Sequence, residues 1–166
     1  MIPLKEVARW VECTACHGQY AEAALAHDPE AEARAFEAAF HGAARGLLVR
    51  AAIVDGAPAD RTLQALAQAL GNLTRQDVPV AEAGRLAEAA EGAAFPGAAA
   101  LLSGVGRSLS EHGKEVLARS VAYVAAAATG ALSAEASALL GEVGQAIDMS
   151  SAHLRGVVAE TLHPAA

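Results

Sequence analysis

Apolar residues recur every three to four positions along most of the chain, which is the spacing of one face of an α-helix. Leu63, Leu66 and Leu70 show this spacing clearly. β-branched residues are few and never alternate with polar ones, so no strands are expected. The pattern predicts eight helices, over about residues 4–26, 29–54, 59–70, 80–91, 97–106, 110–129, 133–147 and 150–163.

Two segments of the chain have the same order of features. A long helix, a short loop containing glycine and a second amphipathic helix come first around Val54-Asp55-Gly56 and again around Ala128-Thr129-Gly130. With one extra residue in the second loop, the apolar spacing of Leu63, Leu66 and Leu70 matches that of Leu140, Val143 and Ile147. We interpret this as an internal repeat of helical hairpins, although any two amphipathic hairpins in an alanine-rich chain look alike.

Composition supports a helical bundle. The chain has 166 residues, a length that suits one domain, and its 54% apolar content includes much alanine but only 4% aromatic residues. Alanine is the best helix former, and its small side chain allows helices to approach closely. We therefore expect an all-α, single-domain bundle of about seven or eight helices.

The formal net charge of −7 makes nucleic-acid binding unexpected, because an acidic surface repels phosphate backbones. No apolar stretch matches the roughly 20 residues of a membrane-spanning helix, so no membrane insertion is expected. A basic and apolar leader is also missing from the first residues. These features predict a cytoplasmic protein, in which paired cysteines serve metal or redox chemistry more often than a structural disulfide.

Both cysteines of the chain lie in one motif, Cys13-Thr14-Ala15-Cys16-His17. On the predicted first helix Cys13, Cys16 and His17 share a face, because they stand at positions i, i+3 and i+4. If the second helix folds back along the first, His41 comes level with this face. Two thiolates and two imidazoles suit Zn²⁺, and Cu(I) is an alternative. The sequence thus predicts a transition-metal site of Cys13, Cys16, His17 and His41.

Other interpretations of the motif stay open. The string resembles the attachment site of c-type haem, with Cys13 and Cys16 as thioether positions and His17 as the axial ligand, which would place the protein in the periplasm. A redox dithiol with a lowered thiol pKa is another alternative. A third is an interaction scaffold that forms a homodimer through Trp10, Tyr20 and His17. The simplest is a pair of ordinary cysteines.

The repeated segment resembles the TerB (tellurite resistance) family over roughly His41 to Glu160. The resemblance rests on Ile53-Val54-Asp55-Gly56-Ala57-Pro58-Ala59-Asp60 and on Ala128-Thr129-Gly130-Ala131-Leu132-Ser133-Ala134-Glu135. It implies an all-α fold and an acidic metal site, for which Asp55, Asp60 and Glu135 are the candidates here. Thr129 replaces the second aspartate of that pattern. The alternative for these acids is a local role at helix ends, where Asp and Glu are favoured.

Together these observations predict an N-terminal helical hairpin with the Cys-x-x-Cys-His motif over residues 1–40 and TerB-like repeats over residues 41–160. The expected function is that of a non-catalytic, metal-binding TerB-like stress or accessory protein, with zinc the expected metal and haem c the alternative cofactor.

Overall fold

A computed structural model describes residues 10–12, 19–21, 29–91 and 96–163 of the chain. Within these residues there are two short strands, seven α-helices and one 3-10 turn. The chain divides into two units, residues 1–36 and residues 37–166. The elements are β1 (Trp10–Glu12), β2 (Gln19–Ala21), α2 (Pro29–Ala52), α3 (Asp60–Thr74), α4 (Val80–Ala90), α5 (Ala98–Leu102), η2 (Gly106–Ser108), α6 (Glu111–Ala126), α7 (Ala134–Ala146) and α8 (Ser151–Leu162).

The expected first helix, residues 4–26, is wrong, because two segments within it are strands. β1 and β2 pair antiparallel, with Val11 opposite Tyr20 and Glu12 opposite Gln19. Trp, Val and Tyr favour strands, and such cross-strand pairs stabilise a sheet. Leu4, Val7 and Val11 have the spacing of a helix face, so apolar periodicity alone does not identify these strands.

The all-helical class is confirmed for residues 29–91 and 96–163. Three of the helices are capped by serine: the hydroxyls of Ser110, Ser133 and Ser150 accept hydrogen bonds from the first turns of α6, α7 and α8. The helix expected over residues 97–106 is shorter. It divides into α5 and η2 around Gly104, because glycine is a poor helix former.

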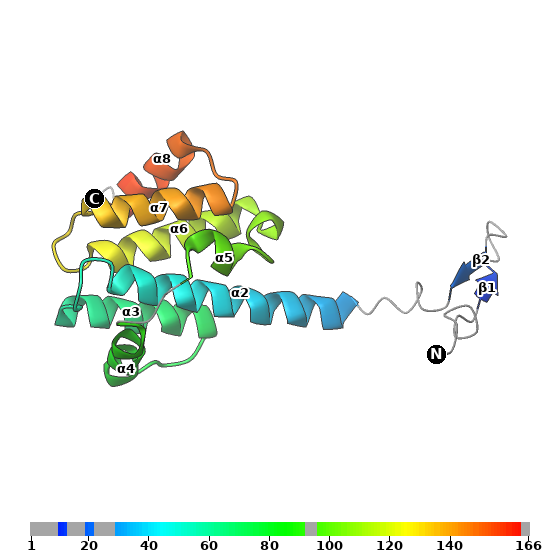
Figure 1. Ribbon diagram of the computed structural model, residues 1–166, viewed down its shortest axis with the longest axis horizontal. Helices are drawn as coiled ribbons and strands as arrows, with labels where there is room; N and C mark the ends of the chain where they lie inside the picture. The colour runs from blue at the N-terminus through cyan, green and yellow to red at the C-terminus, as the bar shows by residue number, and fades with distance from the viewer. Residues whose placement is uncertain (1–9, 13–18, 22–28, 92–95, 164–166) are drawn as a thin grey trace. The chain divides into compact units, whose positions relative to one another are not determined.

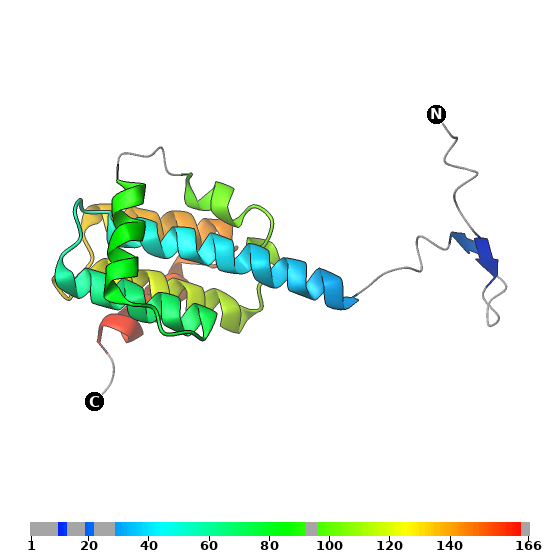
Figure 2. The ribbon, with the colours of Figure 1, turned by 90° about the horizontal axis from the view of Figure 1, so that it is seen from below.

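The helices of residues 37–166 form a layered bundle. Figure 1 shows α6 and α7 beside the pair formed by α2 and α3, with α8 on one side of the bundle and α4 on the other. Figure 2, from below, shows α4 running across the direction of α2 and α3. Among these described residues, no helix has the length and hydropathy that crossing a membrane requires.

The core combines a few large side chains with many alanines. The largest fully buried side chains are Leu47, Leu48, Leu66, Leu102, Leu139, Ile147, Val121, Val124 and Val143. Ala118 and Ala122 of α6 are completely buried between them. Because alanine leaves little space between backbones, the helices approach closely and the core is filled without aromatic residues.

The two predicted hairpins repeat at a constant offset of 74 residues. Each has a seven-residue loop, 53–59 after α2 and 127–133 after α6. Gly56 and Gly130 take the same place in these loops, and both have positive φ, 102° and 77°. All buried residues of α7 have buried counterparts in α3, namely Ala136, Leu139, Leu140, Val143 and Gly144 opposite Thr62, Ala65, Leu66, Ala69 and Leu70.

The residue-by-residue alignment expected from the sequence needs correction. The second loop has no extra residue, so Leu140 corresponds to Leu66, and Leu63 corresponds to Ser137. The apolar spacing of three and four residues is satisfied by more than one register on a helix. The two positive-φ glycines, at the same place in loops of equal length, identify the register with an offset of 74 residues.

The two glycines provide a test of the repeat. Nothing lies within 4 Å of a Cβ added at Gly56 or Gly130, so only the backbone resists a side chain there. We predict that Gly56→Ala and Gly130→Ala each lower the free energy of unfolding by about 1–2 kcal/mol, because a left-handed conformation is strained for L-residues. The measurement is urea denaturation followed by circular dichroism.

Gly141→Ala is the matched control. This glycine lies inside α7, and a Cβ there also meets nothing within 4 Å. The substitution should raise the free energy of unfolding by about 0.5–1 kcal/mol, because alanine is the better helix former. Equal effects at all three glycines would contradict the assignment of the two turns.

Candidate functional site

The predicted metal-binding motif lies outside the described residues. Cys13, Cys16 and His17 fall between β1 and β2 in sequence, directly after Glu12 and before Gln19. Glu12 and Gln19 are themselves paired across the two strands. The three ligands were expected to share one face of a helix. The residues on either side of them, Glu12 and Gln19, lie in strands, so that argument no longer applies.

His41 was expected to complete the site through a pair of antiparallel helices. Residues 10–12 and 19–21 are strands, so they do not form the first helix of that pair. The argument that placed His41 beside the cysteine motif depended on that helix. In residues 37–166 the His41 imidazole is half-buried, 4.0 Å from the Glu37 carboxylate and 6.1 Å from the Phe40 ring between centroids.

The two loops of the repeat meet at one end of the bundle. The Ser133 hydroxyl donates a hydrogen bond of 2.7 Å to Asp55 Oδ1, across 78 residues of sequence. The same hydroxyl accepts a hydrogen bond of 2.9 Å from the Ala136 N–H in the first turn of α7. Asp55 therefore orients the residue that caps the second helix of the other hairpin.

The other two acids of the TerB-like pattern lie at helix starts. Asp60 is in the first turn of α3 and Glu135 is in the first turn of α7, where a negative charge is favourable. Among the described residues, no group of three or more His, Cys, Asp or Glu side chains could hold a metal ion.

Thr129, which replaces the second aspartate of the pattern, makes a local contact instead. Its hydroxyl donates to the Ala131 carbonyl at 2.9 Å. The counterpart of Ser133 in the first loop is Ala59, which has no hydroxyl to donate. An aspartate at position 129 would therefore lack the partner that Asp55 has in Ser133.

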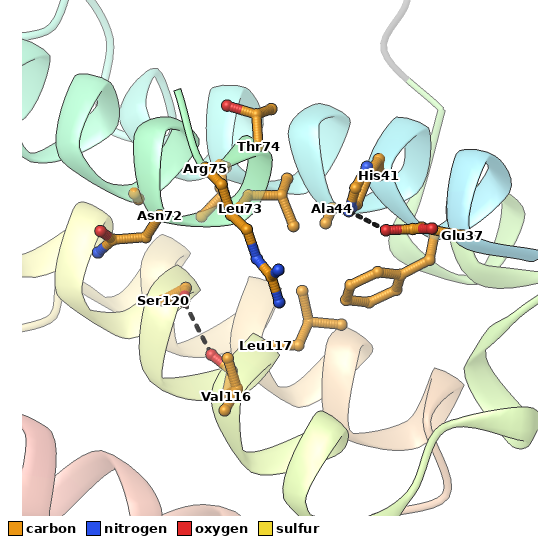
Figure 3. Close-up of a pocket in the computed structure, with 13 residues that line it drawn as sticks. Glu37, His41, Ala44, Asn72, Leu73, Thr74, Arg75, Val116, Leu117 and Ser120 are labelled. Carbon is orange, nitrogen blue, oxygen red and sulfur yellow. Dashed lines mark hydrogen bonds and ion pairs between the residues drawn. The ribbon is translucent and has the colours of Figure 1, made fainter. Parts of the chain in front are cut away.

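A groove that the sequence did not predict lies where α2, α3 and α6 meet. It encloses a cavity of about 300 Å³ (Figure 3). Its apolar wall consists of Phe40, Ala44, Leu48, Ala69, Leu73, Val116 and Leu117, and its polar residues are Glu37, His41, Asn72, Thr74, Arg75 and Ser120. Val116 is 45% exposed, which is unusual for a valine beside a core leucine.

Arg75 is the cation of this groove, which we call the open groove. It directly follows α3 in a left-handed conformation, with φ 55°, and its side chain extends across the groove toward α6 (Figure 3). Within the described residues no ion pair joins Arg75 to a carboxylate, whereas Glu37 lies beside His41. The groove therefore combines an apolar wall with a positive charge, a combination suited to an apolar ligand that carries a carboxylate.

A second polar cluster ties α6 to α8. The Glu115 carboxylate lies at hydrogen-bond distance, 2.9 Å, from Nε2 of the His153 ring. The Arg119 guanidinium donates to the Glu160 carboxylate at 2.9 Å. Lys114 is buried, and its ammonium donates to Glu111 at 2.7 Å. That hydrogen bond first, and the charge of Lys114 second, lower the pKa of Glu111 below its ordinary value. The contacts of Glu115 and Arg119 hold α6 against α8, whereas the contact of Lys114 with Glu111 lies within α6.

No protein-family model, curated protein or solved structure matches this chain.

The contact between the two loops can be measured as a coupling energy. Ser133→Ala removes both the helix cap and the bond to Asp55, so we predict a loss of about 1–2 kcal/mol in the free energy of unfolding. In a double-mutant cycle with Asp55→Ala, the two side chains should be coupled by about 0.5–1.5 kcal/mol. Ser137→Ala is the control, because that hydroxyl donates to the backbone carbonyl of Ser133 and not to a residue of the first loop. Additive effects of the two substitutions would show that the loops do not depend on each other.

The contact between Lys114 and Glu111 predicts a pH dependence. A carboxylate whose pKa is lowered by folding stabilises the folded chain above its unfolded pKa, and this contribution is lost as the pH falls through the folded pKa. Lys114→Met removes it. We expect the stabilisation of the original chain relative to the variant to decrease as the pH falls through the acidic range. The measurement is urea denaturation at several pH values. A constant difference would contradict the contact.

Proposed function

We propose that this chain is a non-catalytic, TerB-like accessory protein that binds a transition metal, zinc, through Cys13, Cys16 and His17. Two cysteines separated by two residues, followed by a histidine, supply soft and borderline donors in close succession. They are the only two cysteines of the chain.

The pairing of β1 with β2 supports this proposal. Glu12 and Gln19, which flank the motif in the sequence, pair across the two strands. Cysteine pairs at this spacing are typical of zinc ribbons and related small zinc sites.

We propose three donors from the motif and do not retain His41 as the fourth. The helix pairing that supported His41 is absent, and Glu37 and the open groove are its neighbours in residues 37–166. Tetrahedral zinc with three protein ligands keeps one position for water or a further donor.

The TerB-like part of the proposal draws its support from the repeat. Two helical hairpins recur at a constant offset, with a positive-φ glycine at the same place in both loops. The pattern that suggested the resemblance, Asp55-Gly56 and Thr129-Gly130, lies in these two loops.

Metal analysis of the purified full chain tests the proposal. We expect about one zinc per chain, and its loss in Cys13→Ser and in Cys16→Ser. Because removal of a group that only supports a metal ligand already costs 10–100-fold in affinity, loss of a thiolate itself should cost more than about 100-fold. Asp55→Asn, Glu135→Gln and His41→Ala are the controls and should keep the zinc.

Two results would contradict the proposal. Zinc that remains in both cysteine variants and disappears in Asp55→Asn or Glu135→Gln would place the metal at the acidic loops. A Soret absorption band that survives acid-acetone extraction would identify covalently attached haem instead, and His17→Ala would then leave the haem attached.

A further inference from the structure

The repeat relates the open groove to a second groove that the chain fills itself. The open groove runs along the junction of α3 with α6. Its counterpart, 74 residues away in each helix, is the junction of α7 with α2. The cross-contacts of the two junctions start from equivalent residues, because Gln68 of α3 bonds to Tyr123 of α6 at 2.8 Å and its counterpart Glu142 of α7 bonds to Arg50 of α2 at 2.9 Å. Their partners differ by one position, since the counterpart of Tyr123 is Val49, the residue before Arg50.

The segment from α5 to η2 fills the junction of α7 with α2. Leu101 lies so close to Gly46 of α2 that an added Cβ would be 3.1 Å from the leucine side chain. Gly106 lies so close to α7 that an added Cβ would be 2.6 Å from the Ala146 carbonyl oxygen. Leu102 and Val105 of the same segment are buried. A short helical turn with apolar side chains therefore completes this junction.

No described segment does the same at the junction of α3 with α6. The counterparts of Gly46 and Ala146 are Ser120 and Asn72, and both line the open groove. Val116 stands where the filled junction has Gly42, and it is 45% exposed. Val116 and Ser120 are larger than the glycines at the equivalent positions of the filled junction, and the groove that they line contains a cavity of about 300 Å³.

We propose that the open groove binds a segment of a partner protein: a short helical turn with two neighbouring apolar side chains and one carboxylate. The apolar side chains would contact Phe40, Val116 and Leu117, as Leu101 and Leu102 occupy the filled junction. The carboxylate would pair with Arg75, the cation for which the described residues hold no partner. The cavity volume is at the lower end for small-molecule sites and suits a few side chains. This inference does not rest on the metal site.

The conformation of Arg75 gives a variant that separates binding from folding. A left-handed residue after a helix is usually glycine, and an arginine there is strained. Arg75→Gly should therefore keep or increase the stability of the fold while removing the charge that recognises the partner. Loss of binding in this variant cannot be attributed to unfolding.

The experiment uses the full chain and a fluorescent 12-residue peptide that copies residues 97–108, with the substitution Arg107→Glu. Arg107 and Glu142 line the same cavity beside α5, and the substitution Arg107→Glu gives the peptide the carboxylate that Arg75 is proposed to bind. We expect saturable binding, measured by fluorescence anisotropy, that is about tenfold weaker with Arg75→Gly, the equivalent of about 1.4 kcal/mol. Val116→Glu should weaken binding similarly. Val80→Glu is the matched control, because Val80 is 43% exposed on α4 outside the groove, and it should bind normally.

A peptide that retains Arg107 should bind more weakly than its Glu counterpart to the original chain. The proposal is overturned if neither peptide binds at concentrations up to about 1 mM, or if Val116→Glu and Val80→Glu bind equally well. It is also overturned if dodecanoate but not the peptide binds in an Arg75-dependent way, which would indicate a small amphiphile. A dimer in analytical ultracentrifugation that Val116→Glu dissociates would assign the groove to a second copy of the chain and would likewise overturn it.

Discussion

The close approach of alanine-rich helices at two equivalent junctions determines the architecture of residues 37–166. Buried alanines such as Ala118 and Ala122 alternate on α6 with larger buried side chains such as Val121. The equivalent positions of α2, Ala44 and Leu48, are buried as well. A Cβ added at Gly106 would lie 2.6 Å from the Ala146 carbonyl oxygen, so the packing leaves no room for a single methyl group there.

Helical periodicity was sufficient to predict α2 to α8, because each helix buries one face against the others and its apolar spacing records that face. It failed before residue 29. There the apolar residues have the spacing of a helix, but they include Trp10, Val11 and Tyr20, which favour strands. In the structure these three residues lie in the paired strands β1 and β2. Periodicity also could not set the register of the repeat, which is fixed by the equal loop lengths and by the positive φ of Gly56 and Gly130.

The groove could not be predicted, because its parts are distant in sequence. Phe40, Arg75 and Val116 come from three helices or their ends, and only the crossing of those helices brings them together. One signal was present: the comparison of the two hairpins shows glycine at 42 and 46 where the other has Val116 and Ser120. Differences between equivalent positions of a repeat identify the places where one copy has acquired a contact that the other has not. Asp60 and Glu135 lie in first turns of helices, where the sequence already favours acids, whereas the bond of Asp55 to Ser133 joins two loops 78 residues apart and has no local signal.

The exchange of partners between hairpins has a consequence for how the chain acquires its structure. The second helix of each hairpin rests on the first helix of the other, through Gln68 with Tyr123 and through Glu142 with Arg50, and the α7 cap is completed by Asp55. Neither hairpin therefore carries its own complete set of partners, and the stabilising contacts span more than 50 residues of sequence. Folding of this region must close these long loops before its core forms. Two fragments severed between the hairpins would each be largely unstructured, yet they would regain the bundle by associating with one another.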